Sequence, residues 1–380
     1  MRVPNNKINN KNNLAMKKIF ILATIASVAL AGCTKNEPAA PTNEQEVITF
    51  VDPVAHVVTK TVLTPVEYPT TSSFSVFADY HKNVYATDKS ADTNFSAYMR
   101  GTEGVDVTHK TTAIGEFDSY WSPATPYYWP KDGYLTFAAY SPASAKENAA
   151  ISYSIFNGIS IQNYEVKQDL TNQCDLMLSN RVSDQKSTDM VTNSPSPYDG
   201  VQLTFSHVLS AIKFTVATDI DYSAGGYTIT LNTLKVKNAY KQGDLKQFAS
   251  KDVDAVALAN IWSNVDTEET TGYTVCGTDK PLSTTAVKFS EDIDADLVLL
   301  PQGLDHTANS GGKVTAEVVY TIAKAGESSI QYTANLDLSG KTDGKWDAGK
   351  RYIYEITIGM EQVVFAPTVT GWDTQTAVPL

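Results

Sequence analysis

The sequence predicts an all-β protein built as two tandem β-sandwich domains. Residues that favour strands, such as Thr, Val, Ile and Tyr, are abundant, and Tyr alone occurs 20 times. Turn residues interrupt the chain at short intervals, and no helical period persists beyond about ten residues. Regularly spaced short strands of this kind are typical of sandwiches. Removing the first 32 of the 380 residues leaves 348, which is longer than one hydrophobic core usually supports.

An export signal precedes the first domain. Two lysines follow Met16 and lead into an apolar run over residues 19–30, which ends in Leu30-Ala31-Gly32-Cys33. A basic start, about a dozen apolar residues and small residues before a cleavage site are typical of a secretory signal. The run is shorter than the roughly 20 residues of a membrane-spanning helix. We therefore expect residues 1–32 to be a signal peptide whose true start is Met16.

The four-residue box at the end of this signal resembles that of bacterial lipoproteins. The resemblance implies cleavage between Gly32 and Cys33 and acylation of the Cys33 thiol, for example by palmitate. Residues 33–45 are polar and contain proline, so they are expected to form a lipid tether. The chain is therefore predicted to be an exported lipoprotein at the outer membrane and the cell surface. The alternative is an ordinary secretory signal that ends beside a cysteine by chance.

The mature chain is strongly acidic. The signal contains five of the 30 Lys and Arg residues and no acid, so 25 basic residues face 42 acids and the net charge is −17. This balance argues against a nucleic-acid partner, which selects a basic face. Cys174 and Cys276 lack metal-site spacing, and we expect two buried free thiols rather than a disulfide.

Strands of the first domain, residues 46–195, are predicted from short β-favouring runs. Pro130-Lys131-Asp132-Gly133 has the composition of a hairpin turn between two of them. The polar stretch from Arg181 to Gly200 contains two prolines and marks the domain boundary. The predicted strands are 47–51, 57–63, 73–78, 134–140, 151–155, 159–164 and 174–179.

The second domain, residues 196–380, opens with an apolar run whose alternation changes phase. Leu203, Phe205 and His207 share one parity, whereas Ile212 and Phe214 share the other. This change requires a bulge or bend near residues 209–210. A short helix is expected at 252–260. The predicted strands are 227–231, 234–236, 287–289, 297–300, 314–320, 330–336, 352–360 and 363–365.

No motif indicates an enzyme, a metal site or a cofactor. The sequence has no nucleophile elbow, P-loop or dinucleotide-binding glycine motif. The histidines are scattered, and His207 is expected to be a hydrogen-bonded core residue. Asp292, Asp294 and Asp296 alternate like the start of a calcium loop, but Leu297 stands where such a loop needs glycine.

A dense aromatic block has two interpretations. Trp121, Tyr127, Tyr128 and Trp129 could form a platform on which sugar rings stack. Alternatively they are a core-and-edge cluster, because large aromatic side chains dominate burial. We favour the cluster.

Several elements occur together in a specific order. The order resembles that of the fimbrillin family, the Mfa-like and FimA-like subunits of type V pili, over nearly all of the mature chain. The resemblance implies transthyretin-like sandwich domains and a role in a cell-surface fimbria, in adhesion or in fimbria biogenesis. The elements are the lipoprotein signal, Ile48-Thr49-Phe50, Thr59-Lys60-Thr61, Tyr127-Tyr128-Trp129-Pro130, Leu135–Pro142, Leu203–Ser210, Leu299-Leu300-Pro301-Gln302 and Trp346–Tyr354.

The resemblance also implies a mechanism of assembly. In polymerising members of the family a protease removes the first strand after a basic residue, and a strand of a neighbouring subunit takes its place. The matching position here is Lys60, although the usual residue is arginine. The partners expected are other fimbrial subunits, the outer membrane and host or glycan ligands. If Lys60 is merely a solvated residue on an edge strand, the chain is an accessory subunit. The alternative function is a carbohydrate-binding surface lipoprotein of a glycan-uptake system.

Overall fold

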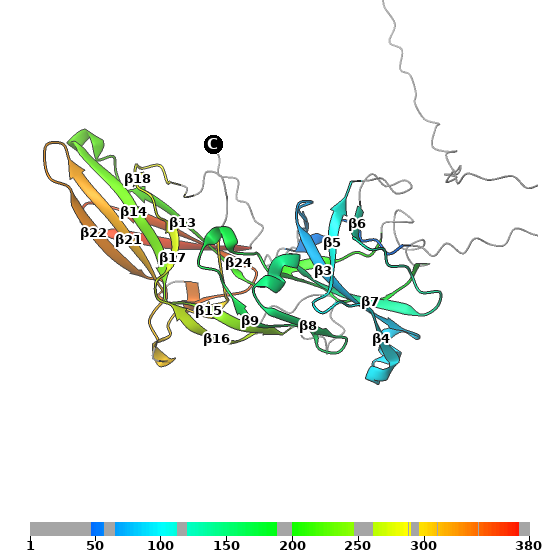
Figure 1. Ribbon diagram of the computed structural model, residues 1–380. Helices are drawn as coiled ribbons and strands as arrows, with labels where there is room; N and C mark the ends of the chain where they lie inside the picture. Colours follow the sequence, from blue (N-terminus) through cyan, green and yellow to red (C-terminus); the bar gives the residue numbers. More distant parts are fainter. Residues whose placement is uncertain are drawn as a thin grey trace, which may run out of the picture.

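A computed structural model describes residues 47–56, 65–111, 120–187, 200–246, 261–287, 289, 296–309, 311–340 and 342–371. The molecule is elongated and consists of β-sheets, with the N-terminal half at one end and β14, β21 and β22 at the other (Figure 1). The all-β sandwich prediction is confirmed. The helices are α1 (Tyr85–Asp88) and the 3₁₀ turns η1 (Asp92–Asn94), η2 (Ala143–Glu147), η3 (Leu170–Asn172), η4 (Ser223–Gly225), η5 (Thr307–Asn309) and η6 (Thr342–Gly344).

None of the helices in the described ranges has the length and apolar character that crossing a membrane requires.

The first sheet is the largest and contains most of the N-terminal half. Its strand order is β2-β1-β12-β10-β7-β3-β5-β6, with β11 beside β7 and β4 beside β3. All pairings are antiparallel except that of β1 with β12. The strands are β1 (Val54–His56), β2 (Pro65–Glu67), β3 (Ser73–His81), β4 (Phe95–Met99), β5 (Val105–Lys110), β6 (Tyr120–Pro123), β7 (Tyr134–Ser141), β10 (Met177–Ser179), β11 (Val182–Gln185) and β12 (Thr204–His207).

Strands β3 and β7 separate two hydrophobic cores. Phe74 and Val76 of β3 point into the first core, which contains the aromatic residues of the N-terminal half. Phe77 of the same strand points into the second core, which continues into the C-terminal half. Successive side chains of a strand face opposite sides, so a strand between two cores is apolar at nearly every position. This explains why β3 is buried along almost its whole length.

A second sheet joins the two halves of the chain. Its order is β16-β15-β9-β8, so strands from before and after residue 195 hydrogen-bond to each other. Strand β12, which follows residue 195, lies in the first sheet instead. The sheets therefore do not separate at the expected boundary, and the division into 46–195 and 196–380 stays a prediction. The strands are β8 (Ala150–Ser154), β9 (Gly158–Glu165), β15 (Ala239–Lys246) and β16 (Trp262–Glu269).

The C-terminal half contains two further large sheets that enclose the second core. One has the order β19-β13-β24-β25, and the other has the order β17-β14-β21-β22 with β18 beside β14. Strands β20 (Gln302–Gly303) and β23 (Lys345–Trp346) form a small pair. The strands are β13 (Ser210–Thr218), β19 (Leu297–Leu299), β24 (Lys350–Ile358), β25 (Val363–Gly371), β14 (Tyr227–Lys237), β17 (Tyr273–Cys276), β18 (Lys280–Pro281), β21 (Thr315–Lys324) and β22 (Ile330–Asp337).

The predicted hairpin at residues 130–133 is wrong. Strand β7 begins after this turn, but it pairs with β3, β10 and β11, whereas β6 lies at the far edge of the sheet beside β5. A turn sequence specifies a reversal of the chain but not the partner of the following strand. Here β7 takes the central position that its burial on both faces requires.

The phase change near residue 209 marks a transfer between sheets. Strand β12 ends at His207 in the first sheet, and β13 begins at Ser210 in a different sheet, parallel to β24. Residues of the first parity, such as Phe205, therefore pack in the first core, and residues of the opposite parity, such as Phe214, pack in the second core. The predicted strand at 57–63 and the helix at 252–260 lie outside the described residues.

The structure describes four residues that the sequence singled out, namely His207, Cys174, Cys276 and Asp296. His207 is buried, and its Nδ1 lies 2.8 Å from the Asp175 carboxylate. Cys174 and Cys276 are free thiols as expected, but only Cys276 is buried, whereas Cys174 is half-buried. Desolvation of each thiol raises its pKa. Asp296 forms an ion pair with Arg351 at 2.5 Å. Within the described residues no cluster of His, Cys, Asp and Glu could hold a metal ion.

Candidate functional site

The N-terminal segment, residues 47–56, lies along the open side of the first sheet. The Ile48 amide donates to the Tyr127 carbonyl at 2.8 Å. Phe50 and Trp121 exchange two backbone hydrogen bonds, of 2.9 and 3.2 Å. On this side the segment therefore pairs as an antiparallel strand with β6 and the residues after it.

The other side of the segment pairs with the chain that leads into β12. The Val51 amide donates to the Val201 carbonyl at 3.2 Å, and the Val201 amide donates to the Thr49 carbonyl at 2.9 Å. Strand β1 then continues this parallel pairing along β12. The segment thus closes the gap between β6 and β12, which stand near opposite ends of the strand order.

Alternate side chains of the segment fill the first core. Ile48 and Phe50 are fully buried, whereas Val47 is exposed. The Phe50 ring makes edge contacts with Phe74 and Phe137, with ring centroids 5.5 and 5.8 Å apart. We define the N-terminal groove as the space between residues 120–128 and 200–204, which the segment occupies. Because aromatic side chains line its base, the groove suits an apolar strand.

Gly200 permits the close approach of this segment. Its φ is +82°, and a Cβ there would lie 2.5 Å from the Thr49 carbonyl oxygen. We expect Gly200→Ala to lower the free energy of unfolding by about 2 kcal/mol through backbone strain and this clash. Gly226 is a matched control, since its φ is +76° but no atom lies within 4 Å of its added Cβ. Urea unfolding should show that Gly226→Ala lowers the free energy of unfolding by about 1 kcal/mol. Equal losses for the two variants would contradict the close approach at Gly200.

The three residues predicted for processing, Gly32, Cys33 and Lys60, lie outside the described residues. Lys60 falls in the undescribed residues 57–64, between β1 and β2, and Gly32 and Cys33 precede residue 47. The structure does describe both flanks of Lys60. Strand β1 pairs with β2, from Val54 opposite Glu67 to His56 opposite Pro65.

The four aromatic residues of the suggested glycan platform do not share one exposed surface. Trp121 is fully buried, and its Nε1 donates to the Asp52 carboxylate at 3.0 Å. Trp129 is also buried, against Phe137. Only Tyr128 is exposed, and Tyr127 is half-buried. The block is thus chiefly a wall of the first core, as large aromatic side chains usually are.

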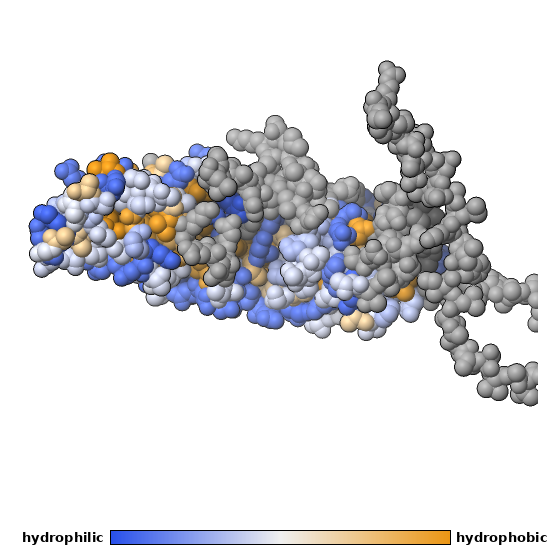
Figure 2. All heavy atoms as spheres, turned by 90° about the horizontal axis from the view of Figure 1, so that it is seen from above, coloured by the Kyte–Doolittle hydropathy of each residue, from blue (hydrophilic) through white to orange (hydrophobic). Residues whose placement is uncertain are grey.

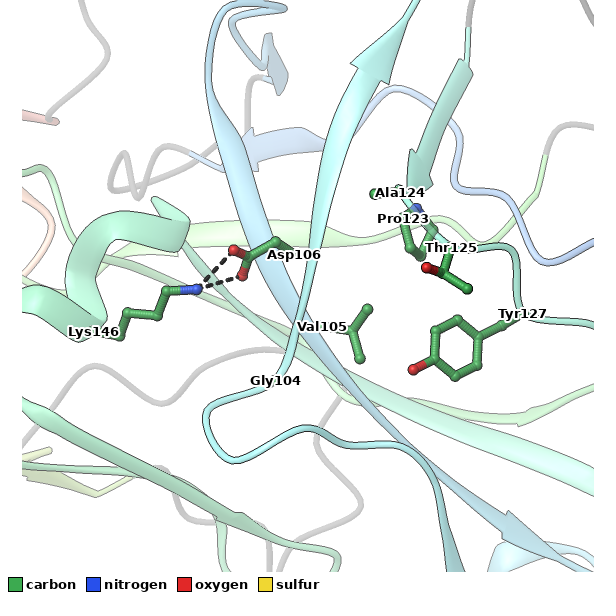
Figure 3. Close-up of a pocket in the computed structure, with 8 residues that line it drawn as sticks. All are labelled: Gly104, Val105, Asp106, Pro123, Ala124, Thr125, Tyr127 and Lys146. Atoms are coloured by element: carbon green, nitrogen blue, oxygen red, sulfur yellow. Dashed lines mark hydrogen bonds and ion pairs between the residues drawn. The ribbon is translucent and has the colours of Figure 1, made fainter.

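A cleft of about 300 Å³ lies beside this wall, where β5 extends past the end of β6 (Figure 3). The Tyr127 and Val105 side chains face each other on one side, and Asp106 points away toward Lys146. The Lys146 ammonium lies 2.7 and 2.8 Å from the two Asp106 oxygens. Because these charges already neutralise each other, the cleft presents no unpaired charged group from this pair.

Of three similar solved structures, the first superimposes well enough to show the same fold. A fimbrial protein from Bacteroides vulgatus ATCC 8482 superimposes with a TM-score of 0.55 at 18% identity, covering 85% of this chain and 99% of that one. A candidate cell adhesion protein from Bacteroides uniformis ATCC 8492 has a TM-score of 0.42 and 16% sequence identity, and the match covers 88% of this chain and 100% of that one. A fimbrial assembly protein from Parabacteroides distasonis ATCC 8503 has a TM-score of 0.30 and 10% sequence identity, and the match covers 86% of this chain and 100% of that one.

A comparison with curated protein sequences finds no significant match. The family model described as fimbrillin-like (Mfa_like_1) matches residues 58–372, which is most of the sequence. The chain therefore belongs to the fimbrillin-like family.

Proposed function

We propose that this chain is a structural or accessory subunit of a cell-surface fimbria, that it is assembled by β-strand exchange, and that it supports adhesion or fimbria biogenesis. One observation carries the proposal. The segment before Lys60 contributes two fully buried side chains, Ile48 and Phe50, to a core whose other described members all follow that lysine in the sequence. Cleavage after Lys60 would leave this segment held by non-covalent contacts alone.

Loss of the segment would open a groove suited to another strand. Backbone groups of Trp121, Tyr127 and Val201 that now bond to the segment would be unpaired. The rings of Phe74 and Phe137 would lose their contacts with Phe50. An incoming strand with apolar residues at alternate positions would restore both sets of contacts, which is the physical basis of β-augmentation.

Strand β25 has the alternation that such a donor needs. Val363 and Phe365 pack against the second core, whereas Val364 between them is exposed. Among the described strands, β25 pairs only with β24 and is therefore an edge strand. Pro367 weakens its free edge by removing an amide donor. An edge strand with one partner can leave its sheet at lower cost than a central strand.

The acyl chains on Cys33 would remain attached to the segment before Lys60, whether or not the chain is cut. In the proposed lipoprotein, the tether of residues 33–45 leads directly into this first strand. If Lys60 is cut, the acyl chains leave with the strand and the subunit enters a fibre. If Lys60 stays intact, Cys33 anchors an accessory subunit permanently at the outer membrane.

A protease experiment tests the proposal. We expect a trypsin-like protease to cut the purified protein after Lys60, giving Thr61 as the new N-terminus and a ladder of oligomers on electrophoresis. Lys60→Gln should abolish both results. Lys82→Gln removes an exposed lysine that directly follows β3, and it should change neither result. Cleavage without a ladder would contradict strand exchange by this chain, and an uncut Lys60 would contradict maturation at that residue.

A further inference from the structure

Among the described strands, β22 forms a sheet edge without the usual protection against pairing. Natural edge strands are kept short or carry charges, prolines or bulges that discourage another strand. Most other edges in the described sheets follow this rule. Strands β2, β6, β17 and β19 have at most four residues, β25 contains Pro367, and β16 contains three acids and a register shift. Strand β22 has eight residues, no proline and no irregularity in its pairing with β21.

The inner face of β22 is also incompletely covered. Ile330 and Tyr332 have the same parity as the buried residues of β21 opposite them, yet 56% and 40% of their surfaces are exposed. Tyr332 stacks on Tyr320 with ring centroids 5.5 Å apart. Figure 1 shows β22 at the outer border of the C-terminal half, with no ribbon beside its free edge, and Figure 2 shows apolar residues on the surface of the same half.

We propose that this edge binds the β22 edge of a second copy of the chain, antiparallel and across a two-fold axis through Thr333. A two-fold axis perpendicular to the sheet keeps the inner faces of both strands on the same side of the joined sheet. This requires a register in which each even-numbered residue lies opposite an even-numbered residue and each odd-numbered residue lies opposite an odd-numbered one. The pairs are then Ile330 with Leu336, Tyr332 with Ala334, Gln331 with Asn335, and Thr333 with its own copy.

This register is favoured by shape and charge. The large Tyr332 ring lies beside the small Ala334, and the exposed Ile330 gains an apolar neighbour in Leu336. The one charged residue of β22, Asp337, already pairs with Lys313 at 2.7 Å and would lie opposite Ser329. An axis through Tyr332 would instead place Glu327 opposite Asp337, and like charges directly opposite are destabilising. An axis through Ala334 would leave Ile330 beyond the paired strands.

The contact is separate from the proposed strand exchange. The N-terminal groove lies at the opposite end of the elongated molecule, and β22 requires no cleavage to pair (Figure 1). The proposal therefore predicts lateral association of copies before processing. Lys60→Gln should still associate through β22 even though it fails to form a ladder, so the failure of either proposal is visible without the other.

Sedimentation equilibrium of the purified protein tests the proposal. We expect the wild type to reach the mass of a dimer as its concentration rises. Thr333→Lys and Thr333→Glu each place like charges on the axis and should give monomers, and an equal mixture of the two should restore the dimer. Thr368→Lys, on the exposed face of edge strand β25, is the matched control and should behave as the wild type. A monomeric wild type, or a dimer unaffected by Thr333→Lys, would overturn the proposal.

Cysteine cross-linking tests the register. Under mild oxidation Thr333→Cys should form a disulfide-linked dimer, because the two residues are opposite each other. Gln331→Cys should not link to its own copy, but it should link to Asn335→Cys in a mixture. The wild type, with its native cysteines, gives the background. Linking of Gln331→Cys alone, or no linking by Thr333→Cys, would overturn this register.

Discussion

Phe50→Ala is expected to lower the free energy of unfolding of the intact protein by about 4 kcal/mol. Replacing a fully buried Phe removes its transfer free energy and leaves a cavity, which together cost roughly 3–5 kcal/mol. Phe50 is fully buried and contacts two aromatic rings, so it lies in this range. Urea denaturation followed by tryptophan fluorescence measures the loss, because Trp121 lies in the same core.

The same substitution separates the segment from the rest of the fold. After cleavage at Lys60 and removal of the segment, Phe50→Ala and the wild type have the same sequence, so their unfolding curves should coincide. Val47→Ala is the control in the intact protein. Because Val47 is exposed, its loss should be within about 0.5 kcal/mol. Unchanged stability for Phe50→Ala would contradict the role of the segment in closing the first core.

Arg100→Ala is expected to cost about 3 kcal/mol at pH 7, because it leaves a buried carboxylate without its counter-charge. Two guanidinium nitrogens of Arg100 donate to one Asp79 oxygen, at 2.6 and 3.2 Å, and Asp79 is fully buried. Among the described residues, no side chain or backbone group lies within hydrogen-bond geometry of the other Asp79 oxygen. Burial raises the pKa of Asp79 above its ordinary value, and the adjacent Arg100 opposes that rise.

The loss should depend on pH. A carboxyl group whose pKa is higher in the folded state destabilises the fold as pH rises from its unfolded pKa to its folded pKa. Removing Arg100 raises the folded pKa of Asp79 further, so the variant should lose less stability at pH 4 than at pH 7. Lys146→Ala breaks a solvent-exposed pair with Asp106 and should cost at most about 1 kcal/mol. An equal loss at both pH values would instead assign the effect to packing of Arg100 on the Tyr153 ring.

The sequence predicted the positions of many strands, because alternation and β-branched residues are local signals. It missed β15 and β16 entirely. Strand β16 reads Trp-Ser-Asn-Val-Asp-Thr-Glu-Glu, which lacks an apolar face because it is an edge strand with many exposed positions. A strand of this kind is held by hydrogen bonds to β15 rather than by burial, so apolar periodicity does not reveal it.

The candidate site was predictable only in part. The alternation of Ile48 and Phe50 indicated a strand, and the resemblance to the fimbrillin family implied Lys60 as a processing position. The aromatic block was also recognisable as core. What the sequence did not indicate was that Phe50 lies between Trp121 and Val201, which are separated from it by 71 and 151 residues in the chain.

The sequence by itself determined the strand-rich character and the apolar face of many of the long strands, since these follow from composition and from a period of two residues. The export signal stays a prediction from the sequence. Only the tertiary structure decided which strands are neighbours. In the structure β7 lies beside β3, and β12 belongs to the first sheet. Strands β8 and β9 form a sheet with β15 and β16 of the second half, and the outer edge of β22 has no partner among the described strands. The physical reason is that backbone hydrogen bonds between strands are the same for every sequence, so partners are selected by how all side chains fill the shared cores.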